Sequence, residues 1–167
     1  PASLKAAFQF LFFANFFFSA LTALAAYTLL PYLSTLMPTP YAGVIAACGG
    51  LVAIIFFPYM PRLAARYGAQ QLALLFALVE MVVLFVLAAA PGLIASILLI
   101  IVMIALQPFL SYELDLLLEA SDETKGTTGR VRAIFLTTWN TGTFVAPLLI
   151  GALLANGDAY SRVFIAA

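Results

Sequence analysis

Five long apolar stretches dominate the sequence and limit what this chain can fold into. Each is close to or above the about 20 residues that a helix needs to cross a bilayer. The stretches are residues 6–30, 41–60, 70–90, 92–118 and 130–154. Strands of a membrane barrel need only about 10 residues, and backbone groups in lipid must be hydrogen-bonded internally. The pattern therefore predicts an all-α, polytopic transmembrane helical bundle with five full spans and the start of a sixth at residues 159–167.

The composition also indicates that lipid is the main solvent of this chain. Hydrophobic residues make up 65% of it and charged residues only 8%, whereas soluble domains have about 25% charged residues. The lipid bilayer is therefore an expected partner. Basic and acidic residues number 7 each, so no excess positive charge indicates nucleic acid. The sequence has no histidine, and Cys48 is its only cysteine, so we expect no metal site and no cofactor.

Prolines mark the expected ends of the spans. We expect Pro31 to end the first span, and Pro58 and Pro61 to close the second. Pro91 and Gly92 predict a tight turn between the third and fourth spans. Short connections of this kind fit a chain that turns back into the membrane each time.

Basic residues distinguish the two sides of the membrane. Only Arg162 falls on one side of the predicted topology. The others share the opposite side: Lys5, Arg62, Arg66, Lys125, Arg130 and Arg132. Loops rich in Lys and Arg stay in the cytoplasm. We therefore expect an integral protein of the cytoplasmic (inner) membrane with a cytoplasmic N-terminus.

The segment Pro61–Gln71 resembles a cytoplasmic loop motif of the major facilitator superfamily, Gly-x-x-x-Asp-Arg-x-Gly-x-Arg-Arg. Arg66 and Gly68 occupy the Arg and second Gly positions of that motif. Ala65 stands in place of its Asp, and two glutamines stand in place of its final basic pair.

Three further segments resemble the same family, in the order expected for it. Residues 129–133 resemble a Gly-Arg-x-Arg-Ala start of span 5, and residues 142–151 resemble the Gly-x-x-x-Gly-Pro-x-x-Gly-Gly pattern of its antiporter branches. Residues 158–167 resemble the start of span 6. The likeness covers nearly the whole chain. It implies an N-terminal six-helix half, incomplete at both ends and cut as helix 6 begins, that works by alternating access with a missing C-terminal half.

Charged residues gather at the expected inner ends of spans 4 and 5. Asp115 and Glu119 stand four residues apart and so share one helix face. The arginines on the same side of the membrane are Arg62, Arg66, Arg130 and Arg132. The resemblance implies that these residues form an inner gate, whose ion pairs favour one conformation. The alternative is an interfacial charge cluster that only fixes the topology.

Neutral polar side chains form one stripe on span 1 and another on span 5. The residues are Asn15, Ser19 and Thr22 on the first, and Thr137, Asn140 and Thr141 on the second. Helical spacing puts each set on one face. Such stripes either line a substrate path or form hydrogen bonds between helices. Spans 1 and 5 face the cavity in the resembled family, which favours the path.

Small residues are spaced to let helices approach closely. They are Ala42, Ala46 and Gly50 on span 2, and Gly142 and Ala146 on span 5. We expect both sets to pack against neighbouring helices.

Glu80 is a charged residue in the middle of span 3. A carboxylate at that depth is costly and is by default a functional hypothesis, for example as a proton carrier. We favour the alternative, a protonated or hydrogen-bonded structural group, because span 3 is usually peripheral in the resembled family. We expect spans 1, 2, 4 and 5 to pack around a cavity, with span 3 outside them. Val79 and Val83 should then face lipid.

These features together predict a secondary transporter, a permease or exporter of an unknown small-molecule substrate. The second hypothesis is a non-transporting membrane sensor or assembly component on the same helical scaffold. A membrane-embedded enzyme comes third, because Glu80 alone is both deep and charged. The sequence contains no nucleotide-binding loop, zinc-ligand spacing or nucleophile elbow, and we assign no catalytic residue.

Overall fold

A computed structural model describes residues 2–89, 91–121, 128–155 and 160–167 of the chain. Four positions used above lie outside these ranges, namely Ala90, Lys125, Asp158 and Ala159. The side chain of Lys5 also lies outside the described part.

Every regular element within the described ranges is helical, which confirms the all-α fold. The elements are α1 (Ala2–Leu36), α2 (Thr39–Phe56), the 3-10 turn η1 (Phe57–Tyr59), α3 (Met60–Tyr67), α4 (Ala69–Ala88), α5 (Leu93–Ser121), α6 (Thr128–Leu154) and α7 (Tyr160–Ala166). Five helical segments in this part of the chain are long and apolar enough to cross a membrane, and they correspond to the five predicted spans. The chain is therefore a helical bundle of the integral membrane type.

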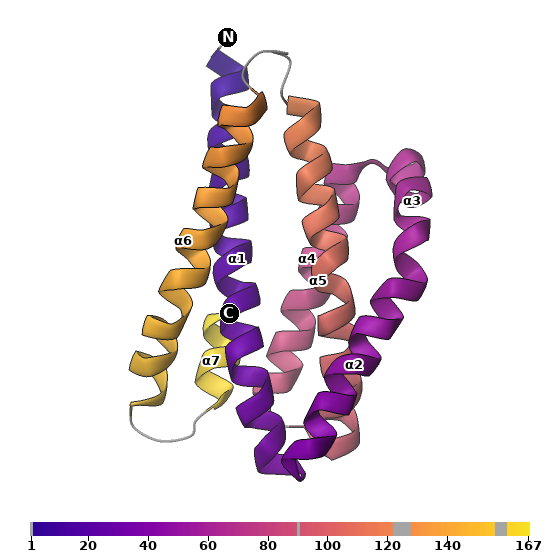
Figure 1. Ribbon diagram of the computed structural model, residues 1–167, viewed down its shortest axis with the longest axis vertical. Helices are drawn as coiled ribbons and strands as arrows, with labels where there is room; N and C mark the ends of the chain where they lie inside the picture. Colours follow the sequence, from indigo (N-terminus) through magenta and orange to yellow (C-terminus); the bar gives the residue numbers. More distant parts are fainter. Residues whose placement is uncertain (1, 90, 122–127, 156–159) are drawn as a thin grey trace.

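The long helices form two groups that lie side by side (Figure 1). α1 packs along α6, while α5 packs against both α2 and α4. α1 also contacts α5 and α2, which joins the two groups, and the short α7 lies against α4, α1 and α6. The N-terminus, α3 and the start of α6 all lie at the upper end of Figure 1, and α7 begins near the lower end. The two ends are called upper and lower below.

The end of α1 differs from the prediction, because the helix continues through Pro31 to Leu36. A proline inside a helix removes one hydrogen bond. In the turn that follows, Ser34 and Thr35 donate their hydroxyl groups to the carbonyl oxygens of Leu30 and Tyr32. Tyr32 and Leu33 are also buried in the lower core, which holds this turn in place. The helix ends just before Pro38, which disfavours the helical conformation in the residue that precedes it.

The connection from α3 to α4 depends on Gly68. Its φ angle is +86°, in the left-handed region that residues with a Cβ atom rarely adopt. Its amide donates to the carbonyl oxygen of Ala64, which closes α3, and α4 starts at the next residue. The turn between α3 and α4 therefore explains why a glycine stands at position 68 of the segment Pro61–Gln71.

Gly142 and Ala146 pack closely against neighbouring helices, as predicted, and both contact α1. A Cβ atom at Gly142 would lie 2.6 Å from the carbonyl oxygen of Phe16 and would overlap the hydroxyl of Ser19. On α2 the prediction is confirmed for Ala42, which is fully buried in the core, but it is wrong for Gly50, because the close approach is at Gly49. A Cβ atom at Gly50 would meet nothing within 4 Å, whereas one at Gly49 would lie 2.7 Å from the Cβ of Ile104.

Buried apolar residues form a core at each end of the bundle. The lower core includes Leu33, Ile100 and Phe164, and joins α1, α2, α4, α5 and α7. The upper core includes Leu114 and Phe135, and joins α1, α4, α5 and α6. Lipid tails are as apolar as leucine, so these cores are stabilised by close packing more than by removal from water.

α4 lies behind α5 in Figure 1, but one of its faces is buried. Glu80 is 1% exposed and Val83 is 5% exposed, so the prediction that Val83 faces lipid is wrong. Val79 is partly buried as well. Residues three apart share a helix face, so turning Glu80 inward also turns Val83 inward. The outward face carries other residues, including Leu78 and Val82.

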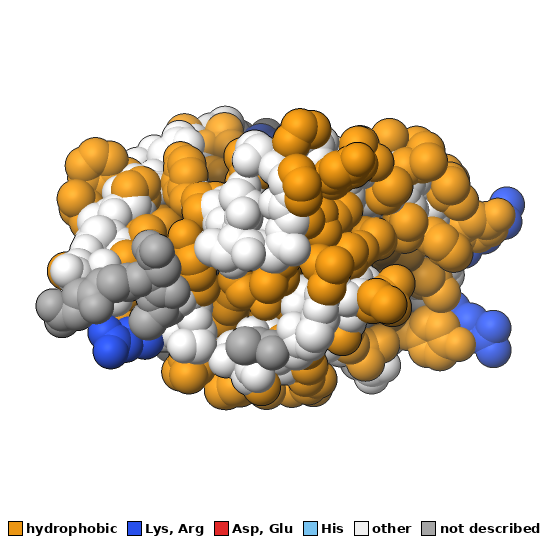
Figure 2. All heavy atoms as spheres, turned by 90° about the horizontal axis from the view of Figure 1, so that it is seen from below, with side chains coloured by type: hydrophobic (Ala, Val, Ile, Leu, Met, Phe, Trp, Pro, Cys, Tyr) orange, Lys and Arg blue, Asp and Glu red, His pale blue; other side chains and the backbone are white. Residues whose placement is uncertain are grey.

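Large apolar side chains cover much of the outer surface. Several of these side chains have exposed fractions between 65% and 76%. Examples are Phe10, Phe13, Phe17, Ile94 and Phe144. Figure 2 looks along the bundle from its lower end and shows many hydrophobic side chains there, interspersed with polar and main-chain atoms. A bilayer would cover such a surface, whereas a monomer in water rarely exposes one.

Candidate functional site

A groove of about 370 Å³ lies between α5 and α6. It is lined by Phe57 of η1, by Pro108, Ser111, Tyr112 and Asp115 of α5, and by Arg132, Phe135, Leu136 and Trp139 of α6. On both helices these residues recur at three- and four-residue steps, so each helix presents one face to the groove. The groove forms because α5 and α6 pack mainly on different neighbours, α5 on α2 and α4, and α6 on α1.

An ion pair crosses this groove near its upper end. The Nη2 atom of Arg132 donates to both carboxylate oxygens of Asp115, at 3.0 and 3.1 Å, and lies 3.7 Å from an oxygen of Glu119. These distances confirm the predicted ion pair between the inner end of span 4 and the start of span 5. The three side chains are 45–61% exposed, and such a pair stabilises by only about 0–1 kcal/mol. The ion pair matters because it joins α5 to α6.

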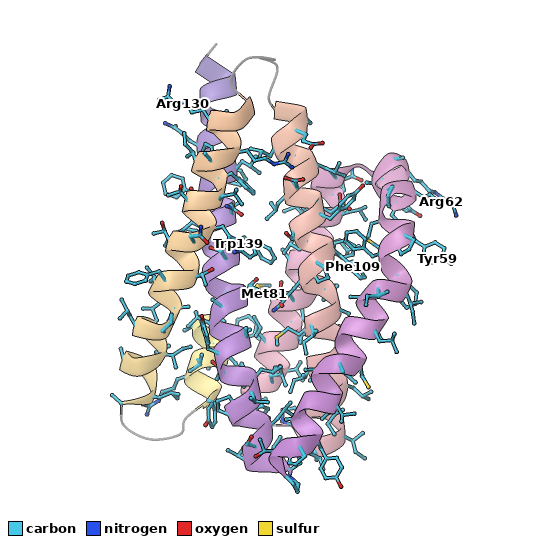
Figure 3. The ribbon with its side chains drawn as sticks, viewed as in Figure 1. Tyr59, Arg62, Met81, Phe109, Arg130 and Trp139 are labelled. Carbon is cyan, nitrogen blue, oxygen red and sulfur yellow. The ribbon has the colours of Figure 1, made fainter. Side chains whose placement is uncertain are left out.

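The other arginines of the predicted inner gate do not reach this pair. Figure 3 shows Arg62 on α3 and Arg130 on α6 pointing outward at opposite edges of the bundle. The guanidinium of Arg66 stands over the ring of Tyr67, 5.2 Å from its centroid. Within the described residues, neither Arg62, Arg66 nor Arg130 forms an ion pair, so the expected six-residue cluster reduces to three residues.

Aromatic rings stiffen the walls of the groove. The rings of Trp139 and Phe18 meet edge to face with centroids 5.6 Å apart, and those of Phe57 and Tyr112 do so at 5.5 Å. Offset and edge-to-face pairs of this kind hold side chains in defined positions. The groove thus combines rigid aromatic walls with a charged end, an arrangement suited to binding a solute that has an apolar body and a charged group.

The polar stripe of span 1 lies inside the contact between α1 and α6. Asn15 is fully buried and donates its Nδ2 to the carbonyl oxygen of Phe135 on α6, at 2.8 Å. Ser19 is fully buried too and donates to the carbonyl oxygen of Phe16. The Thr22 hydroxyl is buried without a hydrogen-bond partner among the described residues. Asn15 therefore forms the hydrogen bond between helices that was the alternative to a path, whereas Ser19 is bonded within α1 and is packed against α6 at Gly142.

The polar stripe of span 5 lies outside that contact, where Thr137 and Thr141 line an open pocket of about 450 Å³ beside phenylalanines of α1. Thr137, Asn140 and Thr141 are all exposed. Thr137 and Thr141 donate their hydroxyls to the carbonyl oxygens four residues earlier on α6, at 2.9 and 2.8 Å. The two stripes are therefore not brought together, and the single path predicted for all six residues is not formed in this conformation.

Two carboxylates are buried in the spans without a partner. Glu80 and Glu113 are 1% and 0% exposed, and none of their four carboxylate oxygens has a hydrogen-bond partner among the described residues. The inward position of Glu80 fits its prediction as a buried carboxylate. The sequence analysis missed Glu113. It stands two residues from Asp115, about 200° around the helix, and shares a face with the buried Phe109 and Leu110. The position of Glu113 around the helix could therefore have indicated from the sequence that its side chain is buried.

Comparisons with known proteins do not extend this assignment. Within the described residues, no group of three or more His, Cys, Asp or Glu side chains is placed to hold a metal ion. No protein-family model, no curated protein and no solved structure matches this chain.

Proposed function

We propose that this chain forms one half of a secondary transporter, a permease or exporter that moves a small solute by alternating access. The observation that carries the proposal is the α5–α6 groove bridged by Arg132. A groove with aromatic walls and a charged end can bind a solute, and the bridge joins two helices that otherwise pack on different neighbours. We also propose that the upper end faces the cytoplasm, because the arginines of α3 and of the start of α6 gather there.

The weakness of the ion pair supports this role. Alternating access requires contacts that form in one conformation and break in the other at low cost. A half-exposed pair contributes about 0–1 kcal/mol. At about 1.4 kcal/mol per factor of ten, it biases an equilibrium by up to about fivefold. A bias of this size favours one state without locking the bundle in it.

The exposed side of α6 supports a second helical bundle as partner. Asn140 is exposed and makes no hydrogen bond within the described part of the chain. An amide facing hydrocarbon is costly, so protein or water should cover it in the working molecule. A second transporter half on this face would do so. The competing proposal, a sensor or assembly component, would use the same face to dock a protein without any transport cycle.

The reporter for this proposal is a cysteine at Ser111, an exposed residue of the groove, in a Cys48→Ala background of the full-length protein. Arg132→Ala should speed its alkylation from the N-terminal side by up to about fivefold, since the bridge is lost. Arg130→Ala is the matched control. It lies two residues away on α6, is exposed and forms no ion pair with a described residue, so it should change nothing. Equal alkylation rates in the Arg132→Ala and Arg130→Ala variants would refute the proposal that this ion pair acts as a gate.

A second reporter separates transport from sensing. Gly151 is exposed and lies three turns below Asn140 on the same face of α6. In a transporter, Arg132→Ala should slow alkylation of a cysteine at Gly151 from the opposite side of the membrane, because opening one end closes the other. Faster labelling at Ser111 with no loss at Gly151 would favour the sensor or assembly component instead.

A further inference from the structure

The charges at the upper end of the α5–α6 groove do not balance. The carboxylates of Asp115 and Glu119 share the single guanidinium of Arg132, at 3.0 and 3.7 Å. Arg130 does not line the groove and points outward (Figure 3). The charged side chains that meet at this end therefore leave one negative charge uncompensated. A cation is attracted to such an end, whereas an anion is repelled from it.

The residues that join α5 to α6 do not reverse this balance. Their structure lies outside the described ranges, but their sequence holds Asp122 and Glu123 against Lys125. Acidic residues thus outnumber basic ones in the connection as well. The sign of the charge at this end does not depend on how the connection is folded.

A solute can reach the uncompensated charge. The side chains of Asp115 and Glu119 are 45% and 61% exposed, unlike the fully buried Glu113. A carboxylate can accept about four hydrogen bonds, and the Nη2 atom of Arg132 supplies one to each oxygen of Asp115. Asp115 therefore keeps free acceptor capacity on the groove side, because it lines the groove itself.

The walls of the groove favour the same sign of charge. Phe57, Tyr112, Phe135 and Trp139 all line it. Trp139 lies seven residues after Arg132, which is about two turns or 10 Å along α6. The π-systems of aromatic rings attract cations, and tryptophan does so most strongly. An anion or a neutral group gains no such attraction.

The size and polarity of the groove limit the rest of the solute. At about 30 Å³ per water molecule, the volume of about 370 Å³ equals roughly twelve waters. A single aromatic ring with a small ammonium group is of this size. Besides the ion pair, the polar side-chain groups of the lining are the hydroxyls of Ser111 and Tyr112 and the indole N–H of Trp139. A sugar, which has many hydroxyl groups, would therefore find few partners.

We propose that the α5–α6 groove binds a monovalent organic cation, a small ammonium compound with an apolar body. Its charge lies beside Asp115, and its body lies against Tyr112 and Trp139. The proposal rests on the proposed function, because it names the class of solute that this groove would carry. The bound cation also competes with Arg132 for Asp115, so binding weakens the bridge between α5 and α6.

The test measures binding of radiolabelled benzyltrimethylammonium to the full-length protein in phosphatidylcholine nanodiscs. This probe carries a permanent positive charge, so its charge does not change with pH. Binding should be saturable above that of protein-free nanodiscs. Neopentylbenzene, which has carbon in place of the nitrogen, should compete much more weakly, and so should the anion 3-phenylpropionate. Equal competition by either compound would overturn the proposal.

Two charge variants should act in opposite directions. Asp115→Asn should weaken binding by about fivefold, and Arg132→Ala should strengthen it by a similar factor, because it frees both carboxylates. Glu113→Gln is the matched control on α5. It alters a buried carboxylate that does not line the groove, so the affinity should not change. Weaker binding in Arg132→Ala, or equal affinities in Asp115→Asn and Glu113→Gln, would overturn the proposal.

A third variant tests the aromatic wall without touching the ion pair. Trp139→Leu should weaken binding by about threefold or more, whereas Trp139→Phe should retain most of it. Phe144→Leu is the matched control, because Phe144 is exposed on the same helix and does not line the groove. Wild-type affinity in Trp139→Leu would overturn the placement of the solute.

The results separate this proposal from the proposed function. If the cation does not bind saturably but Arg132→Ala still speeds alkylation at Ser111, the solute class is refuted and the gate stands. If the cation binds as described but Arg132→Ala and Arg130→Ala give equal alkylation rates, the gate is refuted and the cation site stands.

Discussion

Replacing Gly142 with alanine would test how closely α1 and α6 approach one another. The new Cβ atom would lie 2.6 Å from the carbonyl oxygen of Phe16 and 3.0 Å from the amide nitrogen of Ala20, and would overlap the hydroxyl of Ser19. The hydroxyl can rotate away, but the two main-chain atoms cannot. The helices must therefore separate, and the buried hydrogen bond from Asn15 to Phe135, about two turns away along the same contact, should weaken.

Two opposing terms set the size of the effect. Alanine is a better helix former than glycine by about 1 kcal/mol. Overpacking a well-packed contact costs about 1–3 kcal/mol, and a clash with main-chain atoms belongs near about 3 kcal/mol. The net loss is then about 2 kcal/mol. For a chain of this length each kcal/mol shifts Tm by about 2–4 °C, and by less in a longer chain, so Tm should fall by at most about 4–8 °C.

Gly151 supplies the matched control on the same helix. A Cβ atom there would meet nothing within 4 Å, so Gly151→Ala should raise Tm by about 2–4 °C through helix propensity alone. Thermal unfolding of the purified full-length protein in detergent, followed by the fluorescence of Trp139, measures both variants. A Tm for Gly142→Ala at or above that of wild type would refute the close contact.

Two further predictions concern the asparagines and the topology. Asn15→Leu should lower stability by about 1 kcal/mol, because it removes the hydrogen bond between α1 and α6, whereas Asn140→Leu should lower it by less, because the Asn140 side chain makes no hydrogen bond to a described residue. Equal Tm values for the two variants would contradict these placements. In a Cys48→Ala background, a cysteine at Thr39 should react with an impermeant maleimide from outside intact cells, and one at Thr127 only from inside. Outside labelling at position 127 would reverse the proposed orientation.

The spans could be predicted from the sequence because one quantity, the length of each apolar run, decides them. All five predicted spans correspond to helices of the structure. The ends of the spans depend on smaller differences in free energy between helical and non-helical conformations. Pro31 does not end α1, because Tyr32 and Leu33, which follow it, are buried in the lower core. Pro38 does end the helix, since the residue before a proline is pushed away from the helical conformation. The two prolines also differ in sequence, because Pro38 is followed two residues later by Pro40.

The inward face of α4 could have been predicted more fully than it was. Once Glu80 is turned inward, the 100° step between residues fixes the rest of the helix, including Val83. The expectation that Val83 faces lipid conflicted with that step. The ion pair of Arg132 was predictable for a similar reason, because Asp115 and Glu119 share one face of α5. The distance of Arg62 and Arg66 from this pair depends on where α3 sits relative to α5, which no local pattern encodes.

The two polar stripes show that helix packing determines whether a polar side chain is buried or exposed. Gly142 and Asn140 are two residues apart, which is about 200° around a helix. A helix that uses Gly142 for close contact must therefore turn Asn140 away from that contact. The neighbour that fits against Gly142 is α1, and its atoms nearest to that position belong to the stretch that carries Ser19 and Asn15. Close packing at one glycine thus buries the stripe of α1 and exposes the stripe of α6. If a solute path exists beside α6, Asn140 and the α5–α6 groove can border it, and Asn15 and Ser19 cannot do so until α1 and α6 separate.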